Sequence, residues 1–126
     1  MAELMTRSPL PTAVLAEYDE LAIGAIWALR RAGLRVPEDV SVVGIDNHEM
    51  AEYFGLTTVA QDVIAQGQTA ARLLLQLLDA AAPAAQAPHV LVATRLLLRS
   101  STGPALGLGD QPAVMTDPDA SPVSER

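Results

Sequence analysis

Apolar residues follow two different rhythms along the chain. Short apolar runs are typical of buried strands, and they occupy residues 12–16, 40–45, 56–60 and 90–98. The first of these runs shows no alternation, which predicts a strand covered on both faces. Helical spacing of apolar side chains covers residues 21–32 and 62–81, and a short helix is expected at 49–53. This alternation of strands and helices predicts an α/β fold with a parallel sheet.

The first long helix has clear boundaries in the sequence. Its apolar positions share one face at the spacing i, i+3, i+4, i+7, and they are Ala22, Ala25, Ile26 and Leu29. Gly33 supplies a stop signal, and the cations Arg30 and Arg31 in the last turn complement the helix dipole. Asp19 stands where an N-cap is expected, so its carboxylate has either that structural role or a role in ligand binding.

Polar residues follow three of the predicted strands at the point where each strand ends. Parallel strands with right-handed crossovers bring their carboxyl ends to one edge of the sheet, where ligands bind. Carboxylates and carboxamides at such an edge accept hydrogen bonds from the hydroxyl groups of a sugar or similar polyol. The candidate ligand-binding residues are Tyr18, Asp19, Asp46, Asn47, Gln61 and Asp62. Asp62, like Asp19, is alternatively only an N-cap, whereas Asp46 directly follows a buried strand.

Two apolar residues of the first helix lie off its buried face. Ile23 and Trp27 are four positions apart, and Tyr53 with Phe54 on the following short helix would extend the same ridge. A helix that is apolar on more than one face is either central in a core or part of a subunit contact. Both interpretations stay open at this point.

The charge balance argues against direct contact with nucleic acid. The chain carries fifteen acidic and eight basic residues, a net charge of −7, whereas a duplex-binding surface needs clustered cations. All the basic residues are arginines, and the closest group is Arg30, Arg31 and Arg35 at a helix end, where the structural explanation is sufficient. We therefore expect no DNA binding by this chain alone.

Enzyme, metal and membrane functions find little support. There is no cysteine, no glycine-rich phosphate loop and no serine in a nucleophile elbow, so neither an enzyme nor a bound cofactor is expected. His48 and His89 are far apart, and the adjacent pair His48 and Glu49 diverges on a short helix, so no metal site is predicted. No apolar stretch reaches the roughly 18 residues of a membrane span, and the start of the chain lacks a secretory signal. These features predict a soluble cytoplasmic protein without a membrane partner.

Several segments, in this order, resemble the lactose-repressor/galactose-repressor (LacI/GalR) family of bacterial regulators. They are residues 11–14 (PTAV), 19–25 (DELAIGA), 33–47 (GLRVPEDVSVVGIDN), 56–62 (LTTVAQD) and 96–102 (LLLRSST). The glycine-to-asparagine stretch in the middle is the most specific, because its turn, strand and polar end all agree with the family pattern. The resemblance implies a lobe of a type I periplasmic-binding-protein-like domain that clasps a small effector, commonly a sugar.

The resemblance also implies roles for particular residues. Asp46 looks like the effector-contacting aspartate of the family, and Gln61 and Asp62 fall at the crossover between lobes. Where Tyr18 stands, the family usually has an asparagine, which puts the usual sugar specificity in doubt. Trp27 and Ile23 map to a helix that similar proteins use for dimer contacts, so a homodimer is expected.

The length of the chain departs from the family pattern. We expect a ragged start at residues 1–10, a partial sensor domain at 11–102 and a disordered tail at 103–126. The helix-turn-helix through which such regulators bind operator DNA is absent from the chain. The helix at 62–81 would belong to the missing first lobe, which leaves its apolar stripe without an obvious partner. Two alternatives are a piece of a soluble sugar-binding protein used in transport and a free-standing dimerisation module.

Overall fold

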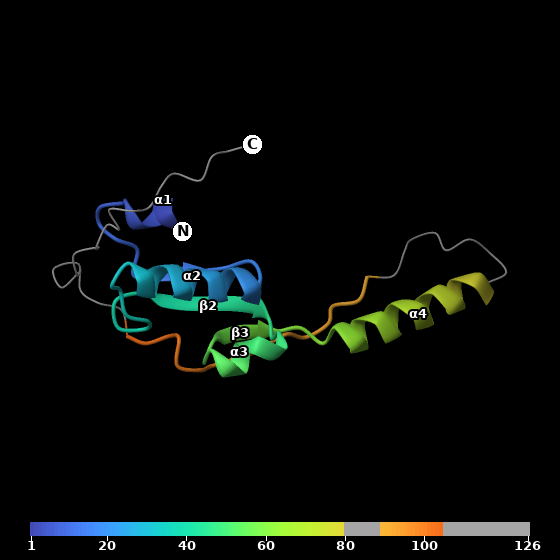
Figure 1. The fold of residues 1–126 in the computed structure, drawn as a ribbon. Coiled ribbons are helices and arrows are strands. Elements are labelled where there is room, and N and C mark those ends of the chain that lie inside the picture. The colour runs from blue at the N-terminus through green and yellow to red at the C-terminus, as the bar shows by residue number, and fades with distance from the viewer. Residues whose placement is uncertain (80–88, 105–126) are drawn as a thin grey trace.

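The computed structural model describes residues 1–79 and 89–104 of the chain. Four strands form one sheet in the order β1-β2-β3-β4, and β2 and β3 lie at its centre (Figure 1). Their bounds are Ala13–Leu15 for β1, Ser41–Asp46 for β2, Thr57–Ala60 for β3 and Arg95–Leu97 for β4. The first three strands are parallel, which confirms the α/β class with a mostly parallel sheet.

β4 differs from the sequence-based prediction. Only Arg95–Leu97 pairs with the sheet, and this strand runs antiparallel to β3. A parallel fourth strand would need the preceding helix to cross over the sheet, but the helix after β3 extends away from it instead (Figure 1). The chain therefore returns alongside β3 in the opposite direction.

Four helices accompany the strands within the described part of the chain. α2 (Asp19–Arg31) packs on β2, and α3 (Glu49–Tyr53) follows β2 directly. α1 (Ala2–Met5) is a short helix in the segment that was expected to be a ragged start, and α4 (Val63–Asp79) is the longest element among the described residues. Residues 80–88 and nearly all of the predicted tail, 105–126, lie outside the described residues.

The core lies between α2 and the sheet. The predicted face of α2 is confirmed, because Ala22, Ala25, Ile26 and Leu29 are all buried. Three of them, Ala22, Ile26 and Leu29, belong to one cluster with Leu34, Val40, Val42 and Leu56, and Met1 and Met5 at the start of the chain pack against the same cluster. α2 stops where predicted, since Gly33 has a φ of 76°, a conformation that glycine adopts without a steric penalty.

β1 is less buried than its unbroken apolar run predicts. Leu15 is 71% exposed and Ala13 is also exposed, so the strand is not covered on both faces. The reason is its position, because β1 is at the edge of the sheet and pairs only with β2. β2, by contrast, is interior, and Val42 is completely buried.

The turn before β2 is held by an ion pair. The Arg35 guanidinium donates to both carboxylate oxygens of Asp39, at 3.0 and 2.7 Å, and the Arg35 amide donates to Asp39 Oδ2 at 2.7 Å. These hydrogen bonds hold the pKa of Asp39 below its ordinary value. The pair fixes residues 35–39 in the turn that leads the chain into the central strand.

A segment near the end of the described chain ties the sheet together, and we call residues 99–103 the strap. Ser101 is buried, and its hydroxyl donates to the Val42 carbonyl at 2.6 Å and accepts from the Thr57 amide at 2.7 Å. The Val42 amide in turn donates to the Ser101 carbonyl at 2.8 Å. The strap therefore joins β2 and β3 through backbone groups that the sheet itself leaves available.

Candidate functional site

A carboxylate and a carboxamide meet at the carboxyl ends of β2 and β3. Asp46 ends β2, Gln61 follows β3, and Gln61 Nε2 donates to Asp46 Oδ1 at 2.8 Å. The two strands are parallel neighbours in which Asp46 pairs with Ala60, and this register brings the two side chains together. Both residues are half-buried, and no other described residue donates to Asp46 Oδ2.

The backbone at this point adopts an unusual conformation. Asp46 has a φ of 113° and Asn47 a φ of 55°, and neither residue is glycine. Residues other than glycine pay on the order of 1–3 kcal/mol for such conformations, which cluster at functional sites. The chain therefore turns sharply at Asp46 and Asn47, where the central strand ends.

Asn47 is held in place by residues that the sequence analysis did not single out. The Asn47 amide donates to Thr58 Oγ1 at 3.2 Å, and Arg99 Nη2 donates to Asn47 Oδ1 at 3.0 Å. Arg99 also donates through Nη1 to the Leu56 carbonyl at 2.8 Å. Arg99 and Thr58 thus position the candidate site, and their distance in sequence from Asn47 left no local signal by which to find them.

Asp19 is neither an N-cap nor exposed to solvent. The N-cap of α2 is Tyr18, and Asp19 is the first residue of the helix and completely buried. Its Oδ1 accepts from Thr58 Oγ1 at 2.7 Å and its Oδ2 accepts from the His48 amide at 2.8 Å. The carboxylate therefore links α2 to β3 and to His48, the residue after Asn47. These hydrogen bonds stabilise the candidate site from inside the fold.

Asp62 and Tyr18 complete the set of predicted residues. Asp62 Oδ1 accepts from the Ala65 amide at 2.8 Å, which is the capping interaction at the start of α4. Tyr18 is 49% exposed, and its side chain makes no capping hydrogen bond. Of the six predicted residues, Asp46, Asn47 and Gln61 thus gather at the strand ends, Asp19 lies beneath them, and Tyr18 and Asp62 flank them.

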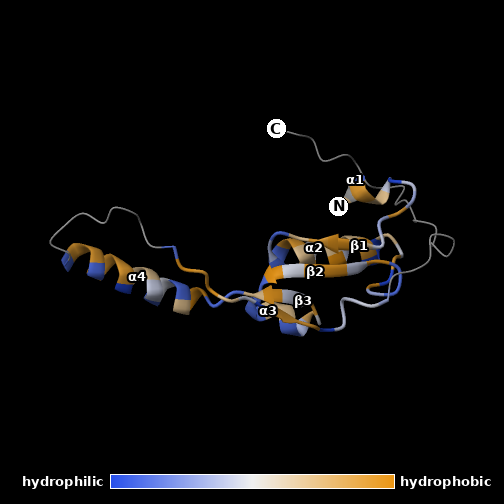
Figure 2. Ribbon diagram, turned by 180° about the vertical axis from the view of Figure 1, so that it is seen from behind, coloured by the Kyte–Doolittle hydropathy of each residue, from blue (hydrophilic) through white to orange (hydrophobic). Residues whose placement is uncertain are grey.

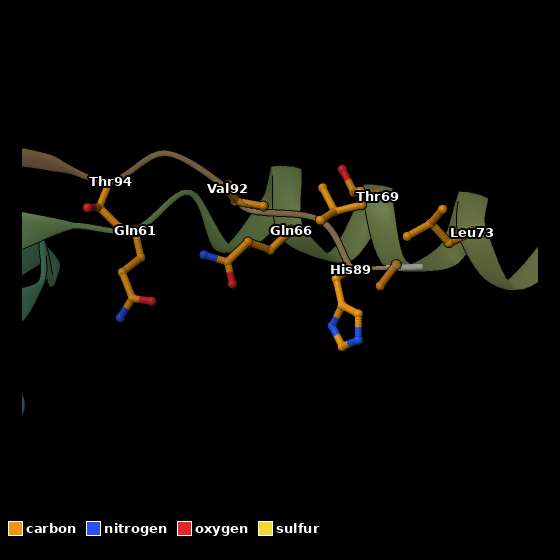
Figure 3. A pocket seen from close by; sticks show the side chains of 9 residues that line it. Gln61, Gln66, Thr69, Leu73, His89, Val92 and Thr94 are labelled. Atoms are coloured by element: carbon orange, nitrogen blue, oxygen red, sulfur yellow. The ribbon is translucent and has the colours of Figure 1, made fainter. Parts of the chain in front are cut away.

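A groove of about 580 Å³ begins at Gln61 and runs between α4 and the extended segment that precedes β4. Gln66 and Thr69 line it from α4, and His89, Val92 and Thr94 line it from the opposite segment. Figure 3 shows the side chains of Gln61 and His89 projecting to the same side of this groove. Its volume falls within the range of small-molecule sites, and its lining mixes amide, hydroxyl and imidazole groups.

The histidines do not form a metal centre. His48 Nδ1 accepts from the Met50 amide at 3.1 Å, and its Nε2 lies 3.9 Å from Glu20 Oε1. Among residues 1–79 and 89–104, no group of three or more metal-binding side chains comes together. No helix within the same ranges is long and apolar enough to cross a membrane.

The predicted apolar ridge is divided between two helices. Trp27 is 61% exposed on α2, with the Arg31 guanidinium carbon 4.8 Å from its ring centroid, whereas Ile23 is half-buried against the core. Tyr53 and Phe54, at the end of α3, are 83% and 37% exposed. Figures 1 and 2 show α2 and α3 as separate helices, and both contribute to one buried cluster, through Ala22 and Ile26 of α2 and Ala51 of α3.

Comparison with known proteins adds a family match. A family model described as a periplasmic binding protein-like domain matches residues 1–102. The protein named "HTH-type transcriptional repressor PurR" from Salmonella paratyphi B is 46% identical over 77 residues, which are 60% of this chain and 23% of that protein. The chain thus spans about a quarter of the length of the curated relatives that it matches.

Solved structures of similar fold also match. A LacI family transcriptional regulator from Enterococcus faecium, with bound ribose, is 39% identical with a TM-score of 0.69, covering 83% of this chain and 38% of its own. A LacI family regulator from Arthrobacter sp. FB24, in complex with lactose, is 38% identical with a TM-score of 0.64, covering 73% of this chain and 35% of its own. Both identities are high enough to relate the chains by sequence as well as by fold.

Proposed function

The chain belongs to the periplasmic binding protein-like domain family, and from this membership we propose that it is the effector-sensing portion of a LacI-type transcriptional regulator. The relatives whose names state a function are transcriptional regulators, which confirms the resemblance noted in the sequence. The proposed effector is a small neutral molecule rich in hydroxyl groups. Operator DNA binding and a cytoplasmic location are assigned to the parent regulator, and no catalytic step is proposed for this chain.

The observation that carries the proposal is the pair formed by Asp46 and Gln61. The carboxylate has one oxygen engaged at 2.8 Å by Gln61, which leaves Oδ2 to accept from a ligand hydroxyl. Gln61 also lines the groove, whereas Asp46 does not, so a ligand that contacts both residues would reach from the strand ends into the groove along α4. Both features support a polyol ligand, because carboxylates and carboxamides bind hydroxyl groups through directed hydrogen bonds.

Electrostatics around the strand ends favour a neutral ligand over an anion. Asp19, Asp46 and Asp62 all lie at or beneath this edge, and Arg99 is occupied by Asn47 and the Leu56 carbonyl. An anionic ligand would meet carboxylates without an available cation, whereas hydroxyl groups would meet acceptors. The relatives solved with ribose and lactose bind ligands of this neutral class.

Each proposed site residue has a distinct role. Asp46 and Gln61 contact the effector, Asn47 contacts it from the adjoining turn, and Tyr18 and Asp62 border the opening. Asp19 acts as a positioning residue, because its buried carboxylate holds Thr58 and the His48 amide behind the turn. Effector binding between this edge and a facing lobe would shift the population of lobe arrangements and so change the affinity of the parent regulator for DNA.

The test is ligand-observed nuclear magnetic resonance of the 126-residue chain against a panel of sugars and nucleosides. We expect a hydroxyl-rich ligand to bind, and Asp46→Asn to weaken its binding about 10- to 100-fold, as loss of a charged acceptor predicts. Asparagine tolerates the positive φ at this position, so the turn is retained. Glu38→Gln, an exposed carboxylate at the opposite end of β2, is the matched control. A ligand whose affinity is the same for Asp46→Asn and Glu38→Gln would refute the site.

A homodimer through the exposed Trp27 patch is part of the same proposal. An exposed tryptophan on a surface helix is typical of the aromatic anchors that dominate interfaces. Trp27→Glu is expected to weaken this contact by at least about 100-fold, while Trp27→Phe retains it. Sedimentation equilibrium checks both variants, and an association constant unchanged by Trp27→Glu would exclude the patch.

A further inference from the structure

The turn that follows the central strand needs support from other parts of the chain. Asp46 and Asn47 both have positive φ angles, 113° and 55°, and neither residue is glycine. Such a backbone costs free energy, so it persists only where the surrounding structure holds it. Asparagine tolerates the left-handed conformation better than most residues do, but the φ of Asp46 lies outside even that region. The place of the candidate ligand-binding carboxylate therefore depends on the contacts that anchor this turn.

Three hydrogen bonds anchor the turn, and each comes from a different element. The Asn47 amide donates to Thr58 Oγ1 of β3 at 3.2 Å, and the His48 amide donates to the buried carboxylate of Asp19 in α2 at 2.8 Å. Both of these use the backbone of the turn, whatever side chains it carries. The third comes from the strap, where Arg99 Nη2 donates to Asn47 Oδ1 at 3.0 Å. Arg99 is the one described residue that binds the Asn47 side chain.

Arg99 can anchor another side chain because it is itself held in place. Its Nη1 donates to the Leu56 carbonyl at 2.8 Å, and its backbone amide donates to Thr57 Oγ1 at 2.9 Å. The strap, which begins with Arg99, is bound to both central strands through the buried Ser101. All the nitrogens of a guanidinium are donors, so the oxygen of the Asn47 amide, and not its nitrogen, faces Arg99. The contact thus fixes both the position and the orientation of the Asn47 side chain.

We propose that Arg99 is a positioning residue for the effector: it does not contact the effector, but by holding Asn47 it keeps the turn in its strained conformation. The Asp46 carboxylate is thereby kept beside Gln61, whose Nε2 donates to Asp46 Oδ1 at 2.8 Å. This inference rests on the proposed function, in which Asp46 contacts the effector. Molecules in which the turn relaxes lose this arrangement, so the apparent affinity falls with the fraction that keeps it.

The geometry of the guanidinium suits this role better than its charge alone does. Its planar fork serves two acceptors at once, which here are the Leu56 carbonyl and Asn47 Oδ1. A lysine would carry the same charge without that fork. Effector affinity therefore depends on a particular side chain that follows Asn47 by 52 residues in the sequence.

The first test needs no ligand and uses the only asparagine of the chain. Isotope-labelled asparagine in the full 126-residue chain gives nuclear magnetic resonance signals from Asn47 alone. Its side-chain amide is expected to be rigid, with an order parameter of about 0.8 that falls below about 0.6 in Arg99→Met. Arg30→Met, which replaces an exposed arginine in the last turn of α2, is the matched control and leaves the order parameter unchanged. An order parameter that Arg99→Met does not lower overturns the proposal.

The second test measures affinity by ligand-observed nuclear magnetic resonance, with ribose, galactose and adenosine as probes. Arg99→Met is expected to weaken the binding of each probe that binds by about 10-fold, as a turn that keeps its conformation in about a tenth of the molecules predicts. Glycine adopts a positive φ without a steric penalty and has no side chain for Arg99 to hold. In an Asn47→Gly background, Arg99→Met is therefore expected to have no further effect. An equal loss in both backgrounds would show that Arg99 acts by another route, and it overturns the proposal.

The inference and the proposed function fail in different ways. If none of the three probes binds the unmodified chain, or if Asp46→Asn leaves their affinity unchanged, the proposed function fails and the inference fails with it. If Asp46→Asn weakens binding and Arg99→Met does not, the effector site stands and only the role of Arg99 is overturned. Arg99→Lys lacks the planar fork and is expected to show the same two effects, so it takes the place of Arg99→Met should that variant not fold.

Discussion

Gly44 of the central strand lies directly against Asp19 of α2, so replacing it by alanine is a direct test of the structure beneath the site. A Cβ at Gly44 would lie 2.1 Å from Asp19 Oδ1 and 3.1 Å from Asp19 Cα. The first contact is impossible for real atoms, and the second involves backbone. The carboxylate of Asp19 must therefore rotate away, and the first turn of α2 must shift by a few tenths of an ångström.

The magnitude follows from what Asp19 holds. Rotation breaks its hydrogen bonds from Thr58 Oγ1 at 2.7 Å and from the His48 amide at 2.8 Å. Hydrogen bonds to a charged group are each worth about 1.5–3 kcal/mol, so Gly44→Ala is expected to lower the free energy of unfolding by about 3–5 kcal/mol. Thr58→Val removes one of these bonds and also the acceptor of the Asn47 amide, so it is expected to cost about 2–4 kcal/mol.

The assay is urea denaturation of the full chain, followed by far-ultraviolet circular dichroism. Gly24→Ala is the matched control, because Gly24 lies inside α2 and a Cβ there meets no atom within 4 Å. The same glycine-to-alanine change is expected to raise the free energy of unfolding by about 0.5–1 kcal/mol at that position. The two substitutions should thus have opposite signs, with unchanged dependence on urea concentration.

Two results would refute this reasoning. One is a Gly44→Ala protein whose free energy of unfolding lies within about 1 kcal/mol of the unmodified chain, since a displaced buried carboxylate costs more. The other is an equal loss for Gly24→Ala, which would show that the effect belongs to glycine replacement in general rather than to the contact with Asp19.

Two further predictions concern other parts of the fold. Ser101→Ala removes two buried hydrogen bonds between the strap and the central strands. It is expected to lower the free energy of unfolding, measured by urea denaturation, by about 2–4 kcal/mol. An unchanged free energy of unfolding would contradict the bridging role of Ser101. Asp39→Asn removes the ion pair with Arg35. In the unmodified chain this ion pair lowers the pKa of Asp39 below its ordinary value of 3.8. Because the folded pKa is depressed, the stabilisation is present above pH 3.8 and disappears as the pH falls through the lower folded value. The difference in urea midpoint between the unmodified chain and Asp39→Asn should therefore be clear at pH 7 and shrink toward pH 3, and a difference that is independent of pH would contradict the assignment.

The elements with strong periodicity could be predicted from the sequence. The face of α2 shows a helical repeat that burial of Ala22 and Leu29 confirms, and β2 is central as its apolar run indicates. α3 begins and ends at the predicted residues. Local signals sufficed in these cases because each element is stabilised mainly by one face packed on the core.

Features that depend on distant residues could not be predicted. Asp19 stands at a position that is typical of an N-cap, but its hydrogen-bond partners, His48 and Thr58, are 29 and 39 residues away. These hydrogen bonds make its buried carboxylate a link between α2 and the central strands. Leu15 is exposed because β1 lies at the edge of the sheet. The apolar run at residues 12–16 does not indicate whether its strand is at the edge or in the interior. The antiparallel direction of β4 depends on α4 leaving the sheet, and Arg99 lies 52 residues from the Asn47 that it orients.

The strap also constrains how the protein is made on the ribosome. Ser101 and Gly103 contact Val42 and Ser41, which precede them by 59 and 62 residues. Because closing such a long loop carries an entropic cost before any contact repays it, the central strands complete their hydrogen bonding only after residue 103 has left the exit tunnel. A nascent chain interrupted before that residue would expose the Val42 carbonyl and the Thr57 amide together, and it would be a natural target for chaperones and proteases.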